Sequence, residues 1–151
     1  FRSVADYFLP ESSGQKDVIG LQIVTLGSEI QTEISKLFAK NNYRDYLHLH
    51  GLAVELTEAA ADYLQSRLQA ALRLPAESDE HSGAAGAEAV PATRYSFGYP
   101  CCPDLASNRT IAALLDAQEM GIEFSEDDQM VPEFTTAAFV VFNPNADYFS
   151  I

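Results

Sequence analysis

The sequence predicts a single α+β domain in which a twisted, mostly antiparallel sheet is flanked by helices. The chain has 151 residues, of which 47% are apolar, and this is enough for one domain with its own core. Two runs of apolar and β-branched residues, 18–26 and 135–142, predict central strands. Apolar residues recur at helical spacing between these runs. Since no internal repeat or domain boundary is evident, residues 1–151 are assigned to one domain.

The first forty residues predict one strand and one helix. Residues 1–17 contain several turn-forming residues and predict an irregular N-terminal segment. The strand predicted over 18–26 follows it. Ser28 and Gln31 form a capping-box pattern, which predicts a helix over about 28–40.

A long helix is expected over residues 44–74. Three of its carboxylates, Glu55, Glu58 and Asp62, lie three and four positions apart and therefore share one face. Such a face is usually solvated, but one of these groups, foremost Glu58, could instead meet a cationic ligand group. The stripe predicted to face the core consists of Leu49, Leu52, Leu56, Ala60, Tyr63 and Leu68.

The second half of the chain begins with a predicted flexible loop over residues 75–93, which is rich in Ala, Gly, Ser, Glu and Pro. A helix capped by Asp104 or Ser107 is expected to end near Glu119, before Gly121. Its predicted buried face consists of Ile111, Leu114 and Leu115. A short strand, an acidic loop, a central strand and a last strand then follow over 122–124, 125–133, 135–142 and 147–151.

Charge and cysteine content exclude several classes of function. The net charge of −13 argues against nucleic-acid partners, because phosphates require basic patches. The sequence contains no run of eighteen apolar residues, so no membrane span is predicted. Cys101 and Cys102 are adjacent, and a disulfide between neighbours is strained, so reduced thiols in the cytoplasm are expected. A redox pair is the alternative.

Common cofactor and metal motifs are absent from the sequence. His48 and His50 lie two positions apart without a third ligand nearby, so no metal site is predicted. There is no Gly-x-Gly-x-x-Gly fingerprint, Walker P-loop or Gly-x-Ser-x-Gly elbow. A nucleotide-like ligand would therefore need a different kind of site.

Residues 94–104 have the composition of such a site. Two prolines stiffen this segment, and Gly98 permits a positive φ or a close approach of a ligand to the backbone. Arg94 offers a planar fork of donors for a carboxylate, while Tyr95 and Tyr99 offer flat faces with polar tips. The segment could therefore present a cation, amides and an aromatic wall to a small polar ligand. A stiff surface connector is the alternative.

The string Arg-x-x-x-Gly-Tyr-Pro-x-Cys-Pro-Asp over residues 94–104 resembles the S-adenosylmethionine-binding signature of the activation domain of cobalamin-dependent methionine synthase. Further stretches resemble the same family in the expected order: 4–8, 20–25, 51–55, 63–64, 121–126 and 143–149. The resemblance spans nearly the whole chain and implies the activation-domain fold. An upstream Asp-Trp-x-Pro stretch of the family is missing, so the chain is expected to be a fragment without the N-terminal part. Cys101 replaces a common Ala.

The resemblance also implies a set of ligand contacts. Arg94 would bind the carboxylate of S-adenosylmethionine, and Glu58 would accept from its ammonium group. Tyr99 would pack against the ligand or brace the loop, while backbone groups supply further hydrogen bonds. Val140 stands where many members place a ligand-contacting Tyr. The implied contacts are Arg94, Tyr95, Ser96, Gly98, Tyr99, Glu58 and Val140.

The function implied by the resemblance is reductive remethylation of cob(II)alamin during methionine biosynthesis. The chain would deliver S-adenosylmethionine to cobalamin held by a neighbouring cobalamin-binding module. Flavodoxin or a flavodoxin-like reductase would supply the electron. The chain would thus be part of a methyltransferase and not a self-sufficient enzyme. The alternative is a docking domain that keeps the fold without binding the cofactor.

Overall fold

The computed structural model describes residues 3–72 and 91–148 of the chain. Of the loop predicted over 75–93, residues 75–90 lie outside the described residues. Its last residue, Thr93, begins a strand. Among the described helices, none is long and apolar enough to cross a membrane.

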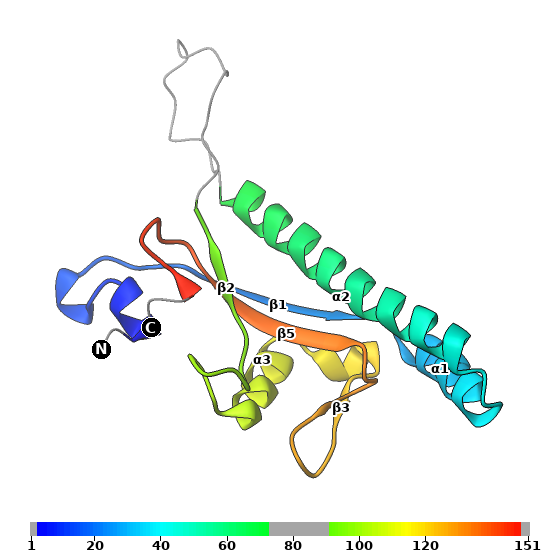
Figure 1. Cartoon of the computed structure of the whole chain (residues 1–151). Helices are drawn as coiled ribbons and strands as arrows, with labels where there is room; N and C mark the ends of the chain where they lie inside the picture. Colours follow the sequence, from blue (N-terminus) through cyan, green and yellow to red (C-terminus); the bar gives the residue numbers. More distant parts are fainter. Residues whose placement is uncertain (1–2, 73–90, 149–151) are drawn as a thin grey trace, which may run out of the picture.

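A three-stranded antiparallel sheet organises the structure (Figure 1). Its strand order is β1-β5-β2, with β1 at Ile19–Thr25, β5 at Thr135–Val141 and β2 at Thr93–Tyr95. Strand β5 pairs with β1 over seven residues. The predicted α+β class and both long strands are confirmed. However, β1 lies at the edge of the described sheet, so the prediction that it is central is wrong.

The two faces of the sheet are covered by different helices. Figure 1 shows the long helix α2 (Tyr43–Ala71) crossing one face and α3 (Asn108–Leu114) lying on the other. On the α2 face, the side-chain amide of Gln22 donates to the carbonyl oxygen of Ala61 at 3.3 Å. The opposite face carries a buried cluster that consists of Ile23, Ile111, Ala112, Ala117, Ile122 and Ala137.

Helix α1 (Ser28–Ala39) precedes α2 and packs against it. The predicted capping box is wrong, because Gly27 occupies the N-cap position and no side chain caps the helix. Gln31 instead uses its side-chain oxygen to accept a hydrogen bond from the backbone of Glu133, at 3.1 Å. The side chain that sequence spacing assigned to local capping therefore makes a long-range contact.

The predicted core stripe of α2 is confirmed at Leu49, which packs against a buried cluster, but it is wrong for Leu52, Leu56 and Tyr63. Small residues form the buried face, namely Ala53, Thr57 and Ala61. By contrast, Leu56 is 49% exposed and Tyr63 is 67% exposed. Small side chains let the helix approach the sheet closely enough for Gln22 to reach the helix backbone. Apolar residues recur at helical spacing along two faces of this helix. The face with small residues is the one that packs on the sheet, because it allows a close approach.

The helix predicted to end near Glu119 is interrupted. Asp104 caps a 3₁₀ turn, η3 (Leu105–Ser107), by accepting from the backbone of Ala106. Helix α3 follows, and then Asp116, with φ 50°, separates it from a second turn, η4 (Ala117–Met120). Of the predicted buried residues, Ile111 is buried, whereas Leu114 is 66% and Leu115 is 37% exposed.

The remaining segments differ from the prediction in detail. The acidic loop contains β4 (Met130–Val131), which pairs with β3 (Glu123–Phe124) in a hairpin. Residues 147–148 form no strand, and 149–151 lie outside the described residues. The N-terminal segment contains two short 3₁₀ turns, η1 (Val4–Tyr7) and η2 (Glu11–Ser13). The side chain of Asn143 donates to the carbonyl oxygen of Tyr7 at 2.8 Å, which joins the early and late segments of the chain.

Candidate functional site

A small cavity of about 170 Å³ lies where the edge strand β2 meets α2 and β5. Arg94 and Ser96 enter it from one side of β2, because alternate residues of a strand point to the same face. The cavity brings together four of the seven residues predicted for a ligand site. Its lining consists of Glu58, Arg94, Ser96, Tyr99, Thr136 and Tyr148.

The guanidinium of Arg94 is held by two carboxylates of α2. Its Nη2 donates to Oε2 of Glu58 at 2.7 Å, and its Nη1 lies 3.3 Å from Oδ1 of Asp62. Glu58 and Asp62 are four positions apart, so both reach the same point from successive turns. Nη1 is buried and makes no hydrogen bond within the described part of the chain. The guanidinium is therefore held mainly through its ion pairs with α2.

Contacts on either side fix the position of β2. The side-chain amide of Gln65 donates to the carbonyl oxygen of Ala92 at 3.1 Å, which joins the strand to α2. The hydroxyl of Thr93 donates to the carbonyl oxygen of Ala146 at 2.9 Å. Val140 lies opposite Arg94 in the sheet and is fully buried. It does not line the cavity, so the structure gives it a supporting position beside Arg94 and no open route to a ligand.

Tyr95 points away from the cavity, to the other face of β2. Its ring is fully buried and stacks on Phe139 at 5.6 Å and on Tyr148 at 5.9 Å between ring centroids. Burial raises the pKa of Tyr95 to about 12, and its hydroxyl makes no hydrogen bond within the described residues. The side chain is therefore a core group, and only its backbone lies near the site.

Gly98 shapes the turn that carries Tyr99. Its φ is +91°, and a Cβ atom there would lie 2.8 Å from a methyl carbon of Leu105, so only glycine fits without strain. The Gly98 amide donates to the carbonyl oxygen of Cys102 at 2.8 Å, and the Cys102 amide donates to that of Tyr99 at 2.9 Å. The Gly98 amide is thus used within the turn.

Sequence reasoning missed three residues of the site. Asp62 was grouped with Glu58 but not chosen. Thr136 shares the face of Val140 on β5, a relation that strand alternation could have revealed. Tyr148 lies beyond the strand and carried no local signal for the cavity. A hydrogen bond with Cys101 raises the pKa of Tyr148, which places its hydroxyl beside that thiol.

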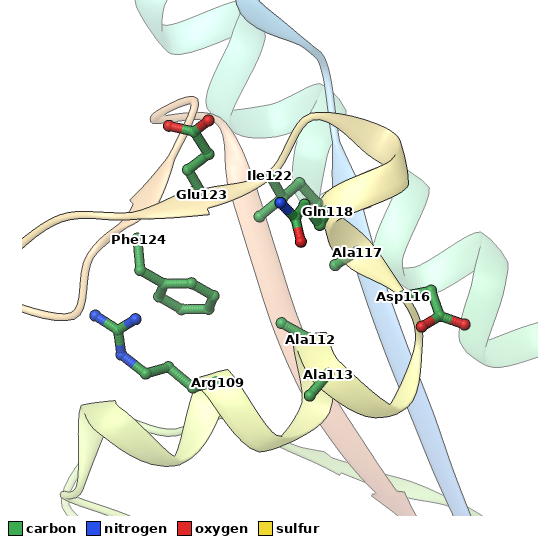
Figure 2. A pocket seen from close by; sticks show the side chains of 9 residues that line it. All are labelled: Arg109, Ala112, Ala113, Asp116, Ala117, Gln118, Ile122, Glu123 and Phe124. Atoms are coloured by element: carbon green, nitrogen blue, oxygen red, sulfur yellow. The ribbon is translucent and has the colours of Figure 1, made fainter.

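Four cavities elsewhere on the described structure are larger, and two of them adjoin α3. Figure 2 shows one of about 510 Å³, in which Arg109 extends beside the ring of Phe124 above several alanines. The Arg109 guanidinium lies 4.7 Å from the centre of that ring and pairs with Asp128. The other cavity, of about 400 Å³ between β1 and α3, is almost entirely apolar. Neither contains residues of the predicted site, so the Arg94 cavity is the candidate site.

Comparisons with known proteins identify the family of the chain. The chain matches, over residues 1–151, the family model described as vitamin B12 dependent methionine synthase, activation domain. It is 37% identical to methionine synthase of Mycobacterium tuberculosis (strain ATCC 25618 / H37Rv) and 36% identical to that of Mycobacterium leprae (strain TN), each over 163 residues. The matches cover 100% of this chain but only 14% and 13% of those proteins.

A solved structure is similar over nearly the whole chain. It is a crystal structure of the MetH reactivation domain bound to AdoHcy, with a TM-score of 0.78 and 26% sequence identity. The similarity covers 96% of this chain and 45% of the other chain.

Proposed function

Because this chain belongs to the activation domain family of vitamin B12 dependent methionine synthase, we propose that it binds S-adenosylmethionine in the Arg94 cavity. The observation that carries the proposal is the meeting of Arg94, Ser96 and Tyr99 with Glu58 in one cavity. The similar reactivation domain is bound to AdoHcy, which is S-adenosylmethionine without its methyl group.

The charges of the cavity suit the amino-acid end of this ligand. The guanidinium of Arg94 would bind the ligand carboxylate, and Glu58 and Asp62 would accept from its ammonium group. The ion pairs within the site would then be exchanged for ion pairs with a zwitterion. No buried charge is left unpaired by this exchange, which avoids a large desolvation cost.

The size of the cavity indicates how the rest of the ligand is held. At about 170 Å³, the cavity is smaller than the roughly 300–1,000 Å³ typical of small-molecule sites. The methionine end therefore fits inside, while the adenosine end lies over the rim. Tyr99, which is 56% exposed, provides a flat face there.

The role of the chain in the reaction is to position the methyl donor. A methylated sulfonium is already reactive, so placement against the acceptor is the main requirement. Cobalamin, held by another module of a longer methionine synthase, would supply the cobalt that accepts the methyl group. A flavodoxin or flavodoxin-like reductase in the cytoplasm would supply the electron for this remethylation.

Calorimetric titration of the chain with S-adenosylmethionine tests the proposal. We expect binding by the wild type and a loss of at least about tenfold in Arg94→Ala, because a charge-assisted hydrogen bond contributes about 1.5–3 kcal/mol. Arg94→Lys should be intermediate, since an ammonium group keeps the charge but not the fork. Arg44→Ala is the matched control, because Arg44 is exposed and pairs with its neighbour Asp45.

Two results would contradict the proposal. Equal affinity in Arg94→Ala and the wild type would remove Arg94 from the site. A folded wild-type chain that binds no S-adenosylmethionine would instead support the docking domain without a cofactor. Circular dichroism of each variant confirms that it is folded.

A further inference from the structure

Two free thiols lie in the turn that carries Tyr99 into the lining of the Arg94 cavity. Cys101 and Cys102 are both half-buried and occupy the last two positions of the turn over residues 99–102. They pack against the cluster around Tyr95 and Phe139. The same turn carries Tyr99 into the cavity lining. The thiols are therefore joined to the site through the backbone.

Side-chain contacts join the thiols to the site a second time. Burial and the neighbouring Cys101 thiol raise the pKa of Cys102, and the Cys101 thiol also raises the pKa of Tyr148, so both groups lie near Cys101. Tyr148 lines the Arg94 cavity and also stacks on Tyr95. Cys101 therefore lies between its partner thiol and one of the aromatic side chains that lines the cavity.

We propose that Cys101 and Cys102 are a modification site, a vicinal dithiol that a hydroperoxide converts to an intramolecular disulfide. The closed ring weakens binding of a ligand in the Arg94 cavity. The weakening of ligand binding rests on the proposed function, whereas the formation of the disulfide does not.

The chemistry balances in two steps. The Cys101 sulfur attacks a peroxide oxygen, so an S–O bond forms, the O–O bond breaks, and Cys101 becomes a sulfenic acid as water or an alcohol leaves. The Cys102 sulfur then attacks the Cys101 sulfur, so the S–S bond forms and the S–O bond breaks with release of water. The two thiols lose two electrons in total, which the peroxide gains. Burial raises the pKa of Cys102 to about 11, which keeps the thiolate scarce, so the second step depends on Cys102 being the chain neighbour of its target sulfur.

Ring closure has to distort the turn. Adjacent Cα atoms lie about 3.8 Å apart across a trans peptide, whereas ordinary disulfides join Cα atoms at least about 4.4 Å apart. The distortion falls on the turn closed by the Cys102–Tyr99 backbone hydrogen bond of 2.9 Å. Oxidation also removes the thiol that contacts Tyr148. Both changes move cavity residues, and the strain makes the disulfide easy to reduce with an external thiol.

Mass spectrometry of the whole chain tests the modification. After treatment with hydrogen peroxide, the wild type should lose two hydrogen atoms, and the peptide containing residues 101 and 102 should resist alkylation until dithiothreitol is added. Cys101→Ala and Cys102→Ala are the controls and should show no such loss. Phenylarsine oxide, which binds paired thiols, should add once to the reduced wild type and to neither variant. Separate sulfinic acids, a disulfide between two chains, or no phenylarsine oxide adduct would overturn the proposal.

Titration with S-adenosylmethionine and tyrosine fluorescence test the effect on the cavity. The chain contains no Trp, so its intrinsic fluorescence reports on tyrosines such as Tyr99 and Tyr148. We expect oxidation of the wild type to change this fluorescence and to lower the affinity at least fivefold. Reduction should reverse both changes, and Cys101→Ala should show neither. A disulfide that changes neither signal would overturn the coupling. If the reduced wild type binds no ligand, the proposed function fails, while mass and fluorescence still decide the dithiol and its coupling to the turn.

Discussion

The guanidinium of Arg94 and the carboxylate of Glu58 lie 2.7 Å apart and join the edge strand to the long helix across 36 positions of sequence. Sequence reasoning assigned these two groups to the carboxylate and the ammonium group of one ligand. In the structure they neutralise each other, with Asp62 as a second anion beside the same guanidinium. These ion pairs keep the charges of the cavity paired and oriented, and a ligand would replace them.

Replacement of Glu58 by Gln should weaken ligand binding more than it destabilises the fold. We expect Glu58→Gln to lower the affinity for S-adenosylmethionine about tenfold, because the ammonium group loses a charged acceptor. Glu58 is 54% exposed, so the free energy of unfolding should change by less than about 1 kcal/mol. Glu55→Gln is the control on the same helix. Wild-type affinity in Glu58→Gln, measured by calorimetry, would exclude the assigned role.

Gly98→Ala should destabilise the chain by about 1–3 kcal/mol, because a side chain there combines a positive φ with a contact of 2.8 Å to Leu105. Gly51→Ala is the matched control, since Gly51 lies within α2 and a Cβ atom there meets nothing within 4 Å. It should stabilise the chain by up to about 1 kcal/mol. Urea unfolding of both variants measures the difference. Equal stability of Gly98→Ala and the wild type would show that the turn adapts freely.

Substitutions in α2 should distinguish its buried face from the predicted stripe. Ala61→Leu should cost about 1–3 kcal/mol, because it overpacks the fully buried contact with the sheet. Ala59→Leu, at an exposed position two residues earlier, should change the free energy of unfolding by less than about 0.5 kcal/mol. Leu56→Ala should cost less than about 1.5 kcal/mol, since half of the side chain is already exposed. A larger loss in the free energy of unfolding for Leu56→Ala than for Ala61→Leu would support the core stripe predicted from the sequence.

Tyr95 should make the chain sensitive to alkaline pH. Burial raises its pKa from 10 to about 12, so the folded chain holds this proton more tightly than the unfolded chain. Between pH 10 and 12 the unfolded chain binds fewer protons, and the free energy of unfolding therefore falls as pH rises. The contribution of Tyr95 is complete below pH 10 and amounts to about 2–3 kcal/mol at most.

Urea unfolding of Tyr95→Phe at several pH values measures this contribution. At pH 7 the variant should differ from the wild type by less than about 1 kcal/mol, because the hydroxyl makes no hydrogen bond within the described residues. Above pH 10 it should lose less stability than the wild type. Tyr63→Phe is the control, since Tyr63 is 67% exposed. Parallel losses in Tyr95→Phe and the wild type would contradict the prediction.

Local sequence was sufficient for the elements whose residues prefer one conformation strongly. The β-branched runs predicted β1 and β5, and helical spacing predicted α1 and α2 to within a few residues. Prediction failed where the local sequence was compatible with two arrangements. The leucine flank and the small-residue flank of α2 are both apolar, and only contact with the sheet selects Ala53, Thr57 and Ala61. The break at Asp116 likewise depends on packing and not on a strong local signal.

The sequence by itself determined the fold class, the family, and the segment around Arg94 as the centre of the candidate site. These depend on residue types and spacings, which are local properties of the chain. Only the tertiary structure decided that Arg94 pairs with Glu58 and Asp62, that Tyr95 turns into the core, and that Thr136 and Tyr148 complete the cavity. The physical reason is that ion pairs and cavities depend on distances between elements, and these are fixed by how closely α2 packs on the sheet.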